Sequence, residues 1–240
     1  MSSPERVAER VALVRERIAT AGGDPAAVRL VAVTKGFGPQ AVEAAMAAGV
    51  ADIAESYAQE LVAKSTALAG PPRGPDAPRW HFIGRLQSNK VKALGSLVAL
   101  WQSVDRSSLV HEIAERAPGA HVLVQVNVSG EARKGGCAPA DAAVLAEQGR
   151  QAGLQVAGLM AIGATGSAEQ SRPGFRLLTE LADRLELRER SMGMSDDFEV
   201  SVEEGSTMVR LGRALFGPRP AELGTAGKAR ALTSRLQEEL

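Results

Sequence analysis

The feature that most restricts the fold is a repeated alternation of short apolar runs with helical patterns between Val28 and Leu211. Each run has the length of a buried strand, and turn residues separate it from a segment with helical spacing. Alternating strands and helices predict a parallel sheet. The strands are expected at residues 28–35, 51–55, 79–84, 98–104, 121–128, 154–162, 191–194 and 207–211.

Eight such units in about 200 residues predict a single α/β domain with the architecture of a (β/α)8 TIM-like barrel. An extra helix is expected at each end, one through Val7 and Ile18 and one through Leu232, Leu236 and Leu240. No break in composition separates a second domain, so residues 1–240 are expected to form one unit. An open, doubly wound sheet is the alternative, but no glycine fingerprint follows the first strand.

The composition of the chain limits the kinds of partner and the cellular compartment that are expected. The 240 residues carry no formal net charge and only 3% are aromatic, so nucleic acid is not an expected partner. The single cysteine, Cys137, excludes an internal disulfide and a multi-cysteine zinc site, and suits the reducing cytoplasm. The polar N-terminus is unlike a signal peptide, and no apolar run is long enough to span a membrane. No exposed apolar stripe indicates an oligomer, so a monomer is expected. A metal site is not expected either.

The first expected strand ends on Lys35, and Gly36, Gly38 and Pro39 follow. Lysine can form a Schiff base once it is deprotonated, whereas arginine cannot. The chain has six lysines against twenty-two arginines, so a lysine is not the default cation here. Lys35 shares a strand face with Val33, and desolvation at the mouth of a barrel would favour its nucleophilic form. Two interpretations of Lys35 remain open: it carries a carbonyl cofactor, or it is a solvated lysine at a strand end.

Two loops on another side of the barrel predict an anion site. Ser195 follows the seventh strand and opens a helix, where N–H groups and a hydroxyl can bind an anion; a simple helix cap is the other interpretation. Gly212 follows the eighth strand and allows a ligand to approach the backbone closely. Barrels often hold phosphate in these two loops. The run from Gly205 to Thr207 precedes the eighth strand, and its place at the bottom of the barrel marks it as a turn.

Arg210 and Met208 share one face of the eighth strand, and Val209 and Leu211 share the other. An arginine that points into the barrel interior needs an acceptor. A pyridine nitrogen would serve, and a structural carboxylate partner is equally compatible. Asn127, near the end of the fifth strand, can meet a ligand edge or be a satisfied core amide. His81 is expected to be a core histidine, and Cys137 to be incidental rather than nucleophilic.

Together these motifs resemble the family of pyridoxal 5′-phosphate (PLP) homeostasis proteins, which look like the barrel half of alanine racemase without its β domain. The resemblance extends from about residue 5 to Pro218. The sequence departs from the family pattern in three places. Many relatives have asparagine in place of Ser56 and threonine in place of Arg213, and many continue the lysine motif with another lysine and a proline where this chain has Gly36-Phe37-Gly38. The segments that carry the resemblance are 31–35, 55–60, 81–90, 158–162, 193–197 and 205–212.

The resemblance implies a PLP-binding barrel of fold type III in which Lys35 holds the cofactor as a Schiff base. It implies that Ser195 and the backbone at Gly212 and Arg213 hold the phosphate, and that Arg210 faces the pyridine nitrogen. Further candidates for cofactor contact are Asn127, Met160 and Met194.

An arginine opposite the ring nitrogen leaves the pyridine unprotonated, because guanidinium does not release its proton. An unprotonated ring is a weaker electron sink, and a racemase would also need a second acid or base, for which Tyr57 is the sole tyrosine. The resemblance implies a function in cytoplasmic PLP homeostasis, with reversible storage and with delivery through transient contact with apo PLP enzymes. The residues themselves indicate cofactor binding without strong catalysis. The alternative is a PLP-dependent amino-acid racemase, and a Schiff-base aldolase without cofactor is a third class.

Overall fold

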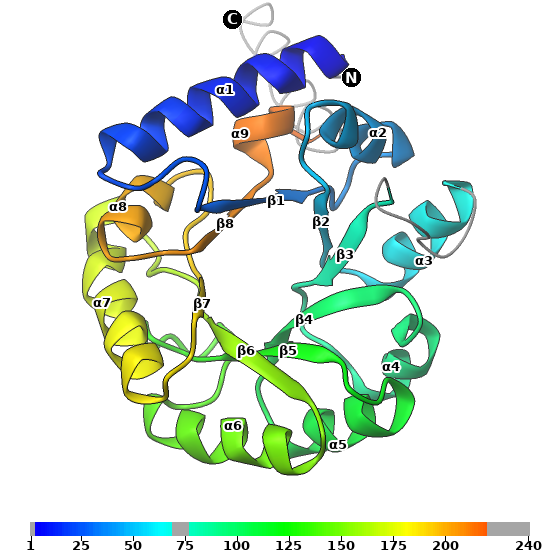
Figure 1. Cartoon of the computed structure of the whole chain (residues 1–240), viewed down its shortest axis with the longest axis vertical. Helices are drawn as coiled ribbons and strands as arrows, with labels where there is room; N and C mark the ends of the chain where they lie inside the picture. Colours follow the sequence, from blue (N-terminus) through cyan, green and yellow to red (C-terminus); the bar gives the residue numbers. More distant parts are fainter. Residues whose placement is uncertain (1–2, 69–76, 220–240) are drawn as a thin grey trace, which may run out of the picture.

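The computed structural model describes residues 3–68 and 77–219, and within them eight parallel strands form a closed barrel. The strands follow chain order around the barrel, and β8 closes the ring against β1 (Figure 1). The expected (β/α)8 barrel is thereby confirmed. The strands are β1 (Arg29–Val33), β2 (Asp52–Glu55), β3 (Arg79–Phe82), β4 (Val98–Val104), β5 (His121–Gln125), β6 (Gln155–Met160), β7 (Glu189–Ser191) and β8 (Met208–Leu211).

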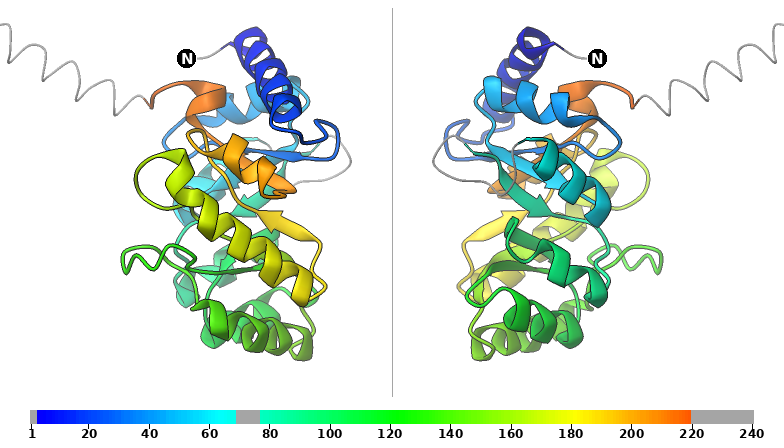
Figure 2. Two further views of the ribbon diagram at one scale, coloured as in Figure 1. Left: turned by 90° about the vertical axis from the view of Figure 1, so that its left-hand side faces the viewer. Right: turned by 90° about the vertical axis from the view of Figure 1, so that its right-hand side faces the viewer.

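Helices surround the strands and cover the outside of the barrel (Figures 1 and 2). The additional N-terminal helix α1 packs against α2, α8 and α9, beside the β8–β1 seam. The helices are α1 (Pro4–Thr20), α2 (Pro39–Ala47), α3 (Ala58–Ala67), α4 (Ser88–Leu94), α5 (Ser107–Arg116), α6 (Ala142–Gln151), α7 (Ala168–Arg184), α8 (Phe198–Glu203) and α9 (Arg213–Phe216), and a 3₁₀ turn, η1 (Pro139–Asp141), precedes α6.

Buried apolar side chains form two clusters on opposite sides of the barrel wall. The larger cluster contains helix residues and one face of the strands, including Leu30 and Ala32 of β1. The smaller contains the alternate strand positions, including Val31, Val33 and Met208. Successive strand residues point to opposite faces, so the smaller cluster is the barrel interior. The strand face of Val31 and Val33, which the alternation assigns to Lys35 as well, therefore points into the barrel.

Two element boundaries differ from the sequence expectations. The fifth strand ends at Gln125 rather than Val128, because the chain turns into a loop in which Val126 bridges Cys137. The helical spacing predicts a helix over residues 175–187, but α7 begins at Ala168, since a capping box at its start supplies partners for its first N–H groups.

Expectations about helix ends also need correction. Capping preference predicts Ser88 as the cap of a helix over residues 89–94, and Asp105 or Ser107 as the cap of a helix over residues 109–117. In the structure Ser88 is the first residue of α4, and Arg106 occupies the N-cap position of α5. The short helix α9 after β8 was not expected at all. The predicted closing helix through Leu232 lies outside the described residues.

Candidate functional site

Lys35 lies just beyond β1, at the carboxyl end of the barrel, and is half-buried. Burial lowers the pKa of its amine, and the cations Arg219 and Arg210 lower it further. Glu55 and Glu60 act in the opposite direction without reversing the shift. Nζ makes no hydrogen bond or ion pair with any residue that the structure describes. An unpaired amine with a lowered pKa is available to attack a carbonyl group.

A buried ion cluster fixes the backbone that carries Lys35. Lys64 of α3 donates to the carbonyl oxygen of Thr34 at 2.7 Å and forms an ion pair with Glu55 of β2. The Thr34 hydroxyl donates to the same carboxylate oxygen of Glu55 at 2.6 Å. Glu55 is fully buried and Lys64 is 4% exposed. The residue immediately before Lys35 is thus held by both its backbone and its side chain.

Glu60 extends this cluster to the other side of Lys35. One of its carboxylate oxygens accepts from Lys64 Nζ at 3.1 Å and from the backbone N–H of Gly36 at 2.9 Å. Sequence reasoning missed this arrangement, because charged residues on a helix are usually solvated. One signal in the sequence could have revealed it. Lys64 follows Leu61 at helical spacing, so both residues lie on the buried face of α3. We call Thr34, Glu55, Glu60 and Lys64 the Lys64 cluster.

Arg210 lies on the interior face of β8, in register with Val31 of β1, and is 3% exposed. Its guanidinium donates to Ser191 O at 2.7 Å, Ser191 Oγ at 2.8 Å and Ala161 O at 2.7 Å. No carboxylate pairs with it in the part of the chain that is described, so the carboxylate alternative does not hold there. Burial lowers the pKa of Arg210 to about 10, which leaves it charged at neutral pH. A guanidinium has five N–H donors, so donor capacity remains for a ligand.

The loops after β7 and β8 meet at the barrel mouth. Ser195 Oγ accepts from the backbone N–H of Ala214 at 3.1 Å, so this hydroxyl does not cap α8, whose N-cap residue is Asp197. The first N–H groups of α9 have no partner within that helix, and together with the hydroxyl they form a polar surface that suits an anion. At Gly212 a Cβ would lie 3.3 Å from Val33 O, so this loop packs closely on the end of β1.

Glycine is required at the start of the loop that carries Ser195. Gly193 has φ +91°, and a Cβ there would lie 2.0 Å from Ser201 Oγ. Asp197 Oδ1 then accepts from the backbone N–H of Met194 at 2.6 Å and fixes the turn. The Gly-Met-Ser-Asp-Asp sequence therefore specifies the path that brings Ser195 to the mouth.

Three other predicted contact residues lie at different depths around the mouth. Met160 ends β6 on the interior face and is buried. Met194 is 39% exposed at the rim. The exposed Arg213 forms an ion pair with Asp196, and the next residue, Ala214, donates its backbone N–H to Ser195.

Asn127 organises the loop that follows β5. Its Oδ1 accepts from Gly130 N at 3.1 Å, and its Nδ2 donates to Glu131 O at 3.0 Å. In the same loop, Lys134 pairs with Glu131 and donates to Gly163 O. The amide of Asn127 and the amine of Lys134 are thus engaged within the protein, although neither observation tests a role in binding.

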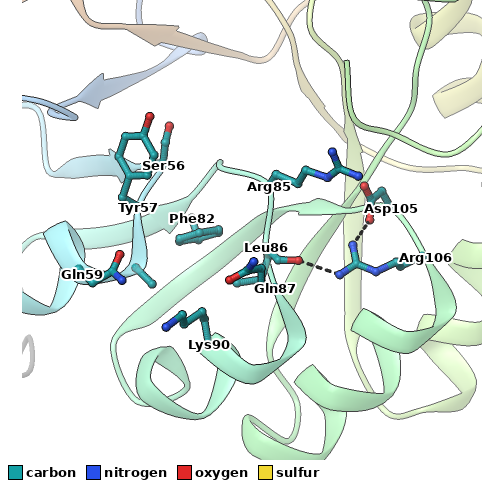
Figure 3. A pocket seen from close by; sticks show the side chains of 11 residues that line it. Ser56, Tyr57, Gln59, Phe82, Arg85, Leu86, Gln87, Lys90, Asp105 and Arg106 are labelled. Carbon is teal, nitrogen blue, oxygen red and sulfur yellow. Dashed lines mark hydrogen bonds and ion pairs between the residues drawn. The ribbon is translucent and has the colours of Figure 1, made fainter. Parts of the chain in front are cut away.

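A pocket of about 740 Å³ lies at the carboxyl ends of β2, β3 and β4 (Figure 3). Tyr57, 59% exposed, lines it together with Arg85 and Lys90. Arg106 also lines it but is held by Asp105 at 2.7 Å. The mouth is therefore hollowed on this side, and its wall carries cationic side chains.

The remaining reactive residue types have structural surroundings. Burial raises the pKa of Cys137 to about 11, so its thiol is protonated at neutral pH and is a poor nucleophile. His81 is buried, as expected, and bonds to Asp52 and Gln102. Over residues 3–68 and 77–219, His, Cys, Asp and Glu side chains form no group of three that could hold a metal ion. A helix with the length and apolar character for crossing a membrane is also absent from these ranges.

The sequence matches the alanine racemase N-terminal domain family over residues 3–220. It is 43% identical over 223 residues to a pyridoxal phosphate homeostasis protein of Pseudomonas aeruginosa, covering 90% of this chain and 95% of that protein. It is 40% identical over 226 residues to the pyridoxal phosphate homeostasis protein of Aquifex aeolicus, covering 89% and 96% of the two chains.

Two solved structures are also similar to this chain. PipY of Synechococcus elongatus, a structure with PLP bound, superposes with a TM-score of 0.75 at 32% identity, covering 88% of this chain and 100% of that one. A protein of unknown function from Bifidobacterium adolescentis superposes with a TM-score of 0.80 at 35% identity, covering 89% and 95% of the two chains.

Proposed function

The chain belongs to the pyridoxal phosphate homeostasis protein family, and on this basis we propose that it binds PLP at the barrel mouth for reversible storage and delivery. The observation that carries the proposal is the convergence of three groups on one end of the barrel. These are the unpaired amine of Lys35, the interior guanidinium of Arg210 and the Ser195 hydroxyl beside α9.

The residues present fit the chemical groups of PLP. When bound, the cofactor supplies an aldehyde that a neutral lysine amine captures as a Schiff base. Burial favours the neutral form of Lys35. Ser195 and the backbone at Gly212 and Arg213 would hold the phosphate, and Arg210 would donate to the ring nitrogen. Asn127, Met160 and Met194 remain proposed contacts around the ring.

Holding the cofactor is better supported than fast catalysis. Arg210 keeps its proton, so it does not protonate the ring nitrogen and cannot strengthen the electron sink. Tyr57, the sole tyrosine, is 59% exposed and no cation among the described residues is paired with it. It is therefore poorly placed to act as a tuned acid or base. The proposed role is a carrier with weak chemistry of its own.

Delivery would require that the site remain accessible from outside. The half-buried Lys35 and the hollow on the β2–β4 side meet this requirement. We propose transient contact with apo PLP enzymes as the route of transfer, and action in the cytoplasm, where the single Cys137 would stay reduced.

The test begins with absorption spectra. Protein purified after incubation with PLP should show a visible band that borohydride removes, and mass spectrometry should map the reduced adduct to Lys35. Lys35→Ala should abolish the band, whereas Lys90→Ala, a change at another mouth lysine, should leave it unchanged. A colourless wild-type protein would refute binding. Loss of optical activity from L-alanine or L-serine that depends on Lys35 would refute the carrier role in favour of a racemase.

A further inference from the structure

A chain of hydrogen bonds crosses the barrel interior and ends on Arg210. Asp52 Oδ1 lies 3.0 Å from His81 Nε2, and His81 Nδ1 lies 2.7 Å from Gln102 Nε2. Ser191 Oγ donates to Gln102 Oε1 at 2.7 Å and accepts from Arg210 at 2.8 Å. These five side chains come from β2, β3, β4, β7 and β8, and each is at most 4% exposed. We call them the interior hydrogen-bond chain.

The groups at its two ends fix the direction in which each hydrogen bond of the interior hydrogen-bond chain is donated. Arginine can only donate and an ionised carboxylate can only accept. Ser191 Oγ therefore accepts a hydrogen bond from Arg210 and donates one to Gln102 Oε1. The Gln102 amide then donates to His81 Nδ1, which leaves the His81 proton on Nε2, directed at Asp52. Every polar atom along this path has a matched partner only when His81 is neutral.

The far end of the chain is firmly anchored. Arg79 donates to both carboxylate oxygens of Asp52, at 2.9 and 2.6 Å. Burial alone would raise the pKa of Asp52, but the hydrogen bonds from His81 and Arg79, together with the charge of Arg79, hold it well below its usual range. Asp52 thus stays ionised, and the chain connects a fixed anion at the amino end of the barrel to a cation at the mouth.

Reversing the direction of these hydrogen bonds would leave buried polar groups without partners. A proton on His81 Nδ1 would require the Gln102 amide to turn its oxygen toward His81. Its NH₂ group would then face Ser191 Oγ, which already accepts from Arg210. The Ser191 proton would lose its acceptor in a site without exposure, which is costly. The protonation state of His81 and the hydrogen bonding of Arg210 are therefore coupled.

We propose that His81, Gln102 and Ser191 are positioning residues that hold the Arg210 guanidinium in the orientation in which it meets the cofactor ring. The inference rests on the proposed PLP site and adds a specific support for it. Ser191 and Ala161 are the direct acceptors for Arg210. Gln102 and His81 act through Ser191, by fixing the direction in which its hydroxyl points. If these residues had only a structural role, substituting them would not change cofactor binding through Arg210.

The first measurement needs no cofactor. The chain has only three histidines, so ¹⁵N NMR of the imidazole nitrogens can resolve His81 by comparison with His81→Gln. Wild-type protein should show the neutral form with the proton on Nε2 at pH 7, and separate Nη signals for Arg210 because its guanidinium does not rotate freely. Gln102→Leu should merge the Nη signals, and Gln102→Glu should convert His81 to the doubly protonated form. A proton on Nδ1 in the wild type, or Nη signals unaffected by Gln102→Leu, would overturn the proposal.

The second measurement uses the loaded protein. Gln102→Leu should weaken PLP binding by about tenfold and shift the visible band, although Gln102 itself does not reach the mouth. In an Arg210→Gln background the same substitution should change neither quantity, because its effect passes through Arg210. An equal effect in both backgrounds would show a purely structural role and refute the proposal.

Two controls separate the possible failures. If Gln102→Leu does not fold, as judged by circular dichroism, Ser191→Ala breaks the chain at the next bond and should give the same pattern. If wild-type protein takes up no PLP, the proposed function fails, while the NMR measurement on the free protein still decides whether the interior hydrogen-bond chain holds Arg210.

Discussion

Replacing Lys64 by methionine should destabilise the protein strongly although Lys64 is not proposed to bind anything. The substitution removes hydrogen bonds to Thr34 O and Glu60 and the ion pair with Glu55. Glu55 would remain, fully buried, and one of its oxygens already lacks a partner among the described residues. Removal of one member of a buried pair costs about 3–5 kcal/mol. For a chain of this size each kcal/mol corresponds to about 2–4 °C, so a loss of about 6–20 °C in Tm is expected.

The loss should depend on pH in a defined direction. Burial raises the pKa of Glu55, and Lys64 opposes that shift, so Lys64→Met raises the pKa further. A carboxyl whose pKa is raised by folding contributes stability that is present at low pH and lost as the pH rises through the folded-state value. The destabilisation should therefore be larger at pH 8 than at pH 5, where Glu55 can take up a proton.

Urea unfolding followed by circular dichroism at pH 5 and pH 8 measures both effects. Lys90→Met is the matched control, because Lys90 forms no ion pair in the described residues and lines an open pocket, and it should change stability by less than about 0.5 kcal/mol. Lys64→Met with Glu55→Gln should recover much of the loss, since no buried charge then remains. A loss below about 1 kcal/mol at pH 8, or one that is independent of pH, would refute the role given to the Lys64 cluster.

Three further changes test other parts of the structure. Gly193→Ala places a Cβ 2.0 Å from Ser201 Oγ on a backbone with φ +91°; thermal unfolding should show a loss of more than about 2 kcal/mol, and a neutral result would contradict the packing. Asp52→Asn should cost about 1–2 kcal/mol above pH 5, because the pKa of Asp52 is lowered by its partners; the difference from wild type should shrink as the pH falls below about 4, and a constant difference would count against this cause. Ser195→Ala should weaken PLP binding by about tenfold with little change in affinity for pyridoxal, which has no phosphate, and equal losses for both ligands in equilibrium titrations would exclude a phosphate contact.

The barrel was predictable because its signal is local and repeated. Each strand is a short apolar run bounded by turn residues, and each helix shows its own spacing, so errors at single boundaries did not alter the count of eight. The errors arose where local signals compete. Val126 and Val128 continue the alternation of β5, yet Val126 instead bridges Cys137 in the following loop. Ser88 is a good capping residue, but the chain enters α4 one residue earlier.

Lys35, Ser195 and Arg210 could be selected from sequence because the barrel rule places strand ends at the mouth and alternation assigns faces. The Lys64 cluster and the interior hydrogen-bond chain could not be selected in this way. Their members lie on different strands and helices, and charged or amide side chains at such positions are usually solvated. Only the closure of the barrel sets Gln102 of β4 within hydrogen-bonding distance of Ser191 of β7.

The sequence by itself determined the class of fold, the strand face that leads to Lys35, and the resemblance to PLP homeostasis proteins, because these depend on periodicity and short motifs. The tertiary structure alone decided which acceptors surround Arg210 and which ions hold Thr34. These are distances between residues far apart in the chain, and no periodicity encodes them. The acceptors of Arg210 meet it because a closed ring of parallel strands brings interior side chains together, and the ions that hold Thr34 meet because α3 packs against β2. Both places are buried, and there each polar group must find a partner.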